Sequence, residues 1–137
     1  MSVQKRKGTR RERLVIETLK AANLDVRRAG NNLPSKDVEL NVAGIPFAIE
    51  VKDRANLPLH VTLGEVATRW ESEIPAVVWH RTGKSDSGVR RPVGPTLVAM
   101  RLDDWATLMG MMQQLFRNAL TGGIDEKRLE GPSEVQG

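Results

Sequence analysis

The stretch that decides the fold is residues 37–52, DVELNVAGIPFAIEVK, in which two alternating segments flank a short turn. Its second half alternates apolar and polar side chains with the period of two that is typical of a half-buried strand. The two alternating sets are Phe47, Ile49 and Val51 on one side and Ala48, Glu50 and Lys52 on the other. The first half repeats the pattern, with an apolar set of Val38, Leu40 and Val42.

Residues 43–46, AGIP, supply turn chemistry between the two halves, so the stretch predicts a β-hairpin. If the loop holds an even number of residues, Asp37 lies opposite Lys52 and Glu39 lies opposite Glu50. All four polar side chains then share one face. An odd loop would send Asp37 to the other face, because a slip of one residue reverses every side chain of a strand.

Carboxylates that face the same way on a sheet repel each other, so the cluster requires a cation or an unusual pKa. A bound metal ion is the economical cation, and oxygen ligands without cysteine suit Mg²⁺, or Mn²⁺ in its place, better than zinc. The alternative is a solvated amphipathic hairpin with surface salt bridges and no site at all.

The composition fits one compact domain, which we place at residues 1–120, followed by a disordered tail at residues 121–137. The chain has 137 residues, with 39% hydrophobic and 28% charged side chains, which are globular values. It has no cysteine, which is compatible with a reducing cytoplasm. No apolar run is long enough for a membrane span or a secretion signal.

The formal net charge of +4 is concentrated at the N-terminus, which favours a polyanionic partner such as DNA. The candidate DNA-binding side chains are Lys5, Arg6, Lys7, Arg10, Arg11 and Arg13. Aromatic side chains are scarce, with three Trp, two Phe and no Tyr. Because single strands are usually held by stacking on aromatic rings, this composition favours a duplex backbone.

The basic segment leads into a helix predicted over residues 9–22, with Val15 and Leu19 in its apolar stripe. Glu12 lies at the edge of that stripe, whereas Glu17 lies on the solvent face. Two explanations of Glu12 remain open. It is either an acid of the first helical turn that the helix dipole favours, or a further carboxylate that reaches the hairpin site.

The remaining chain completes the order α-β-β-β-α-β-β-α, an α/β fold with a mixed sheet flanked by helices. A capping box at Thr62 and Glu65 predicts that the second helix begins there. A mobile loop is expected over residues 81–95. The other expected elements are strands at 24–28, 76–80 and 96–102 and helices at 62–73 and 105–119.

The motifs KRKGTRRERLV, RRAG, SKD and AIEVK, in this order, resemble the Holliday junction resolvases of the PD-(D/E)XK nuclease superfamily, especially the archaeal-type group also found in phages. The resemblance covers about residues 5–80. It implies a restriction-endonuclease-like fold and a Mg²⁺-dependent endonuclease of DNA recombination and repair. It also implies that the protein acts in the cytoplasm of a prokaryote or of a phage-infected host cell. Lys36 stands where the superfamily name places proline, and Asn31 and Asn32 stand where the resolvases tend to have serine.

Carried onto this chain, the resemblance implies that Asp37 and Glu50 bind the metal directly, assisted by the Val51 carbonyl. Glu12 would complete the acidic site, and Lys52 would orient or activate the attacking water. Glu39 is the rival of Asp37 as the ligand of the first strand.

The resemblance also implies a symmetric homodimer, whose paired sites would meet paired phosphates of a four-way junction. The predicted last helix is the candidate interface, because Trp105 and several Met residues recur in it at helical spacing. Two alternatives to a resolvase remain, a PD-(D/E)XK nuclease that cuts flap or duplex DNA and an inactive DNA-binding module of the same fold.

Overall fold

The computed structural model describes residues 3–30, 33–84 and 88–130, and it separates the chain into two units, residues 1–101 and residues 102–137. Each unit is described by itself. The first contains two helices and six strands: α1 (Val3–Ala21), β1 (Asp25–Arg28), β2 (Val38–Val42), β3 (Ile45–Arg54), α2 (Leu59–Arg69), β4 (Ile74–Lys84), β5 (Arg90–Pro92) and β6 (Leu97–Met100). The second is α3 (Leu102–Glu130). The predicted α/β class with a mixed sheet is therefore confirmed.

The β2–β3 hairpin turns on two residues, Ala43 and Gly44, whose φ angles are +52° and +87°. Two consecutive positive φ angles match the twist of the flanking strands. The Asn41 side chain supports the turn, because its Oδ1 accepts a hydrogen bond of 2.8 Å from the Gly44 N–H.

This turn places Val42 opposite Ile45 and Glu39 opposite Ala48. The predicted pairings of Asp37 with Lys52 and of Glu39 with Glu50 were therefore wrong, because Ile45 and Pro46 belong to β3 and not to the loop. The loop nevertheless holds an even number of residues, so the predicted sharing of one face is preserved.

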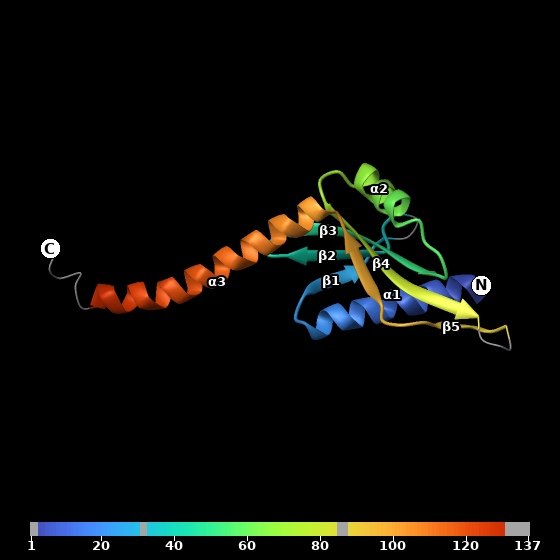
Figure 1. Ribbon diagram of the computed structural model, residues 1–137, viewed down its shortest axis with the longest axis horizontal. Helices are drawn as coiled ribbons and strands as arrows, with labels where there is room; N and C mark the ends of the chain where they lie inside the picture. The colour runs from blue at the N-terminus through green and yellow to red at the C-terminus, as the bar shows by residue number, and fades with distance from the viewer. Residues whose placement is uncertain (1–2, 31–32, 85–87, 131–137) are drawn as a thin grey trace. The chain divides into compact units, whose positions relative to one another are not determined.

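The sheet has the strand order β1-β2-β3-β4-β5, and β6 pairs with β4 beside β5 (Figure 1). The β3–β4 pair is parallel and the other pairs are antiparallel. The connection between the parallel strands carries α2, as a parallel crossover requires. Figure 1 shows α1 and α2 on opposite sides of the sheet. The carboxyl ends of β3 and β4 consequently lie next to each other.

Strand β3 is buried on both faces at residues 47–49. On the face toward α1, Phe47 and Ile49 are buried as predicted, and they line an apolar cleft of about 280 Å³ together with Leu14 and Leu19 of α1. On the opposite face Ala48 is fully buried, as are Val77 of β4 and Val66 of α2. On the same face, Glu50 lies level with Val77 and is half-buried, and Lys52 follows it two residues later.

Several element boundaries differ from the prediction. Helix α1 begins at Val3, and α2 begins at Leu59 after Pro58 with no side-chain cap, so the capping box at Thr62 was wrong. Thr62 is instead buried within α2. Part of the expected loop 81–95 forms the end of β4 together with β5, because Thr82, Gly83 and Lys84 pair with β5.

The second unit is one helix, α3, with Asp103 and Asp104 in its first turn, where acids are favourable toward the helix dipole. The helix continues to Glu130, past the point at which the sequence predicted a tail, and residues 131–137 lie outside the described residues. Across the described helices, no segment combines the length and hydrophobicity needed to span a membrane.

Candidate active site

Asp37 lies just before β2, and the main chain holds it against β3. Its N–H donates a hydrogen bond of 2.8 Å to the Ile49 carbonyl, and its own carbonyl accepts one of 3.0 Å from the Ala29 N–H. The carboxylate is fixed as well, because its Oδ2 accepts a hydrogen bond of 2.8 Å from the Val51 N–H. The hairpin register continues to Asp37 and sets it level with Glu50.

Burial raises the pKa of Asp37 from 3.8 to about 6. The Val51 N–H opposes this shift, the negative charges of Glu50 and Glu12 add to it, and the positive charge of Lys52 counteracts it. Asp37 is therefore in electrostatic contact with every other side chain of the predicted catalytic set. The folded chain thus brings Glu12 of α1 within electrostatic range of Asp37, which lies just before β2, and of β3.

Glu50 and Lys52 lie two positions apart on β3 and so face the same side of the sheet. Glu50 Oε1 lies 3.3 Å from Lys52 Nζ, and the two side chains are 13% and 31% exposed. The pair is thus accessible from solvent without being fully hydrated. Such a lysine keeps a defined position and can still donate to a bound molecule.

Glu12 is held by Arg28 of β1, which the sequence analysis did not identify as its partner. The Glu12 Oε2 atom accepts hydrogen bonds of 3.0 Å from Arg28 Nε and 2.7 Å from Arg28 Nη2. Because α1 begins at Val3, Glu12 is not in the first turn, and the helix-dipole explanation was wrong. Its negative charge instead acts on Asp37.

Glu39, the rival ligand, is engaged elsewhere. Its Oε2 lies 2.6 Å from Arg27 Nε, and its Oε1 lies 3.6 Å from Lys36 Nζ. The hydrogen bond from Arg27 lowers the pKa of Glu39, in contrast to the raised pKa of Asp37. The geometry accordingly favours Asp37 over Glu39 as the carboxylate of the site.

Lys36, which directly precedes Asp37, is buried. Its Nζ lies 2.9 and 2.8 Å from the two carboxylate oxygens of Glu73 and 3.7 Å from the centre of the Trp70 ring. Trp70 also donates a hydrogen bond of 2.9 Å to the Pro34 carbonyl. These contacts tie the segment that precedes Asp37 to the residues at the end of α2. Lys36 thereby holds the main chain before Asp37 in place through tertiary contacts.

A second polar group on the α1 side of the sheet was also missed. Arg11 Nε lies 3.0 Å from Asp53 Oδ2, and Asp53 is the register partner of His80 on β4. His80 is buried, with Nδ1 2.8 Å from Thr96 Oγ1. The available signal was Asp53 itself, a charged residue that continues the apolar set of Ile49 and Val51.

The predicted DNA-binding residues divide into three groups. Arg11 is half-buried and paired with Asp53, whereas Arg10 and Arg13 are exposed on α1. The main chain of Lys5, Arg6 and Lys7 is helical, but their side chains lie outside the described residues. The ion pair places Arg11 at the carboxyl end of β3, on the α1 side of the sheet.

The donor set suits a hard divalent cation, because Asp37 and Glu50 offer carboxylate oxygens and their mutual repulsion would be relieved by positive charge. Within the described ranges, no three acidic or histidine side chains are arranged to hold one metal ion. A metal site would therefore consist of two carboxylates completed by a main-chain oxygen, as the resemblance implies for Val51.

The chain was compared with known proteins by sequence. No protein-family model matches it, and the curated proteins include no significant match.

The Lys36–Glu73 pair supplies a stability prediction. Lys36→Ala leaves a carboxylate that is 16% exposed without its partner, so we expect a loss of about 3 kcal/mol in the free energy of unfolding. Arg27→Ala breaks an ion pair whose arginine is 79% exposed, and we expect a loss below about 1 kcal/mol. Urea unfolding measures both values. Equal losses for the two variants would contradict a structural role of Lys36.

The raised pKa of Asp37 predicts how stability depends on pH. The unfolded carboxyl group loses its proton at a lower pH than the folded one, so this group weakens the fold as pH rises from about 4 through 6. Asp37→Asn keeps an acceptor for the Val51 N–H and should raise the unfolding midpoint at about pH 7 but not at about pH 4. Urea unfolding in EDTA at both pH values measures this difference.

Glu39→Gln is the control of opposite sign. The pKa of Glu39 is lowered in the folded state, so its stabilising contribution is present at neutral pH and disappears as pH falls. Asp37→Asn and Glu39→Gln should therefore shift the midpoint at about pH 7 in opposite directions. Shifts of the same sign would show that the environment of Asp37 differs from this description.

Proposed function

We propose that the chain is a metal-dependent, structure-selective DNA endonuclease of the PD-(D/E)XK superfamily that resolves four-way junctions by phosphodiester hydrolysis. The observation that carries the proposal is the grouping of charges around Asp37: the Val51 N–H fixes its carboxylate, Glu50 is paired with Lys52 at 3.3 Å, and Glu50, Glu12 and Lys52 all act on it electrostatically. A purely structural hairpin gains nothing from half-burying a carboxylate beside two others. The observed α-β-β-β-α-β succession from α1 to β4 also agrees with the fold that the resemblance implies.

Each residue of the set has a chemical task in this reaction. Asp37 and Glu50, with the Val51 carbonyl, would hold Mg²⁺ or Mn²⁺, which when bound supplies hydroxide near neutral pH and offsets charge on the phosphoryl oxygens. The Val51 N–H fixes one Asp37 oxygen and leaves the other available. Lys52 orients the attacking water and places positive charge where negative charge develops.

Glu12 has a supporting task. Arg28 holds its carboxylate from β1, so the charge of Glu12 acts on Asp37 from a fixed position on α1. This negative charge adds to the repulsion between the carboxylates, so a bound cation would stabilise the site more strongly. In the proposed enzyme, α1 thereby couples the basic N-terminal segment that would hold DNA to the acidic site.

Cleavage of a labelled four-way junction tests the proposal. With Mg²⁺ we expect symmetric cuts by the parent and none in EDTA. Asp37→Asn and Lys52→Ala should lower the rate by about 10²-fold or more, because each removes a group that acts on the reacting atoms. Glu17→Gln, an exposed acid on α1, is the matched control and should cut like the parent.

Other outcomes separate the alternatives. Preferential cutting of flap or linear duplex DNA would retain the nuclease and discard the resolvase. Tight junction binding without cutting under either metal would identify an inactive DNA-binding module.

We also propose that α3 pairs with α3 of a second copy, which would give the symmetric dimer that junction resolution requires. Trp105, Met109, Met112 and Phe116 recur at spacings of four and three residues, the pattern of a two-helix seam. Trp105, Met112 and Phe116 are 51%, 40% and 64% exposed, an unusual state for large apolar side chains on one helix face. A second copy of the same helix would cover them.

Sedimentation at micromolar concentration tests the dimer. We expect a dimer mass for the parent and a monomer mass for the double variant Met112→Glu with Phe116→Glu, because charges in an apolar seam disfavour association. Gln114→Glu, on the exposed polar side of α3, should remain dimeric. A monomer mass for the parent would count against this interface.

A further inference from the structure

The sheet face that carries Glu50 and Lys52 continues beyond them into a row of arginines on three neighbouring strands. The register sets Lys52 beside Trp79 and Arg54 beside Arg81, and Gly83 lies opposite Arg91 of β5. Residues two apart on a strand and register partners on adjacent strands face the same way. Arg54, Arg81 and Arg91 therefore share the face of Glu50 and Lys52, which we call the catalytic pair. We call these three side chains the arginine row.

The arginine row is exposed and lacks counter-charges. All three residues are exposed, and within the described part of the chain no ion pair neutralises any of them. Arg11, Arg27 and Arg28, by contrast, each pair with an acid. Three unpaired guanidinium groups on one rigid surface repel each other and favour an anionic ligand that spans the strands.

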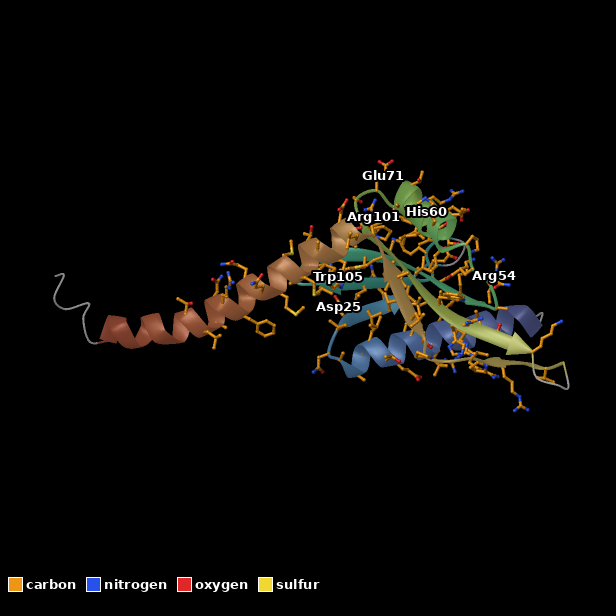
Figure 2. All side chains as sticks on the ribbon, viewed as in Figure 1. Asp25, Arg54, His60, Glu71, Arg101 and Trp105 are labelled. Carbon is orange, nitrogen blue, oxygen red and sulfur yellow. The ribbon has the colours of Figure 1, made fainter. Side chains whose placement is uncertain are left out.

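Two local contacts give the row a fixed backbone. The Trp79 Nε1–H donates a hydrogen bond of 2.9 Å to the Arg54 carbonyl, which ties the end of β3 to β4. The Val93 N–H donates one of 2.8 Å to the Arg81 carbonyl, which ties the segment after β5 to β4. Gly83 admits this packing, because a Cβ atom there would lie 2.8 Å from Val93 Cγ2. Figure 2 shows Arg54, the last residue of β3, on the outside of the fold.

We infer that the arginine row is a second nucleic-acid contact surface, which binds the phosphate backbone of a duplex and presents it to Lys52 and Glu50. Arg54 follows Lys52 by two residues, about 6.6 Å along the strand, and the row then crosses strands about 4.8 Å apart. A continuous backbone with regularly spaced phosphates fits such a row better than a single small anion does. The inference rests on the proposed function and deepens it by assigning how the duplex next to the cut is held.

The surface is separate from the predicted N-terminal contacts. Arg10 and Arg13 lie on α1, on the other side of the sheet, whereas the arginine row lies on the face of the catalytic pair. Contacts from both sides would fix the direction in which a duplex passes the end of β3.

Binding of a fluorescein-labelled duplex, followed by anisotropy in EDTA at several KCl concentrations, tests the inference without requiring cleavage. Each of Arg54→Gln, Arg81→Gln and Arg91→Gln should weaken binding and reduce the slope of log K against log salt by about 0.9, the value for one lost phosphate contact. Arg81→Lys keeps the charge and should restore the slope. Arg69→Gln, an exposed arginine in the last turn of α2, removes the same charge elsewhere and should leave the slope unchanged.

The outcomes distinguish this inference from the proposed nuclease. Reduced slopes for the three variants together with no cleavage by the parent would uphold the arginine row and refute the nuclease. If the chain cleaves DNA and all three variants keep the parent's slope of log K against log salt, the nuclease stands and the arginine row is not a DNA-contact surface. Loss of slope in Arg69→Gln as well, or no duplex binding by the parent, would also overturn it.

Discussion

The register of the β2–β3 hairpin is the constraint on which the candidate site depends. Ala43 and Gly44 both adopt positive φ angles, and this turn pairs Val42 with Ile45. Every later pair follows from that one, including the level placement of Asp37 and Glu50. A slip of one residue would move Asp37 to the opposite face and bury polar groups against α1. The two-residue turn therefore determines the chemistry of the hairpin as well as its shape.

Around this hairpin, charges are balanced unequally on the two sides of the sheet. On the α1 side, Asp53 has Arg11 and Glu12 has Arg28, so each acid has a fixed cation. Asp37 has the Val51 N–H as a fixed donor, and burial raises its pKa to about 6. The three carboxylates of Asp37, Glu50 and Glu12 thus gather beside two cations, Lys52 and Arg28, in a basic protein. This is the electrostatic arrangement expected where a cation is to bind and act.

Along the sheet face toward α2, buried apolar side chains give way to charged ones. This face contains Ala48 and Val77, which are fully buried. Glu50 lies level with Val77, and Lys52 and then the arginine row follow along the same strands. Lys36 links the two regions, because it binds Glu73 and Trp70 at the end of α2 and directly precedes Asp37. Packing, acidic site and basic surface therefore follow one another along the same strands.

The sequence alone determined the elements whose signal is local. The alternation in residues 37–52 predicted the hairpin. It also predicted the shared face of Asp37, Glu50 and Lys52 for a loop with an even number of residues, because side-chain direction in a strand depends only on parity. The tertiary structure decided which charges meet. Arg28 reaches Glu12, Arg11 reaches Asp53 and Lys36 reaches Glu73 across separations that no periodicity encodes. Pairing between distant strands likewise formed β5 from an expected loop and aligned the arginine row, because register is fixed by long-range hydrogen bonds and not by local preference.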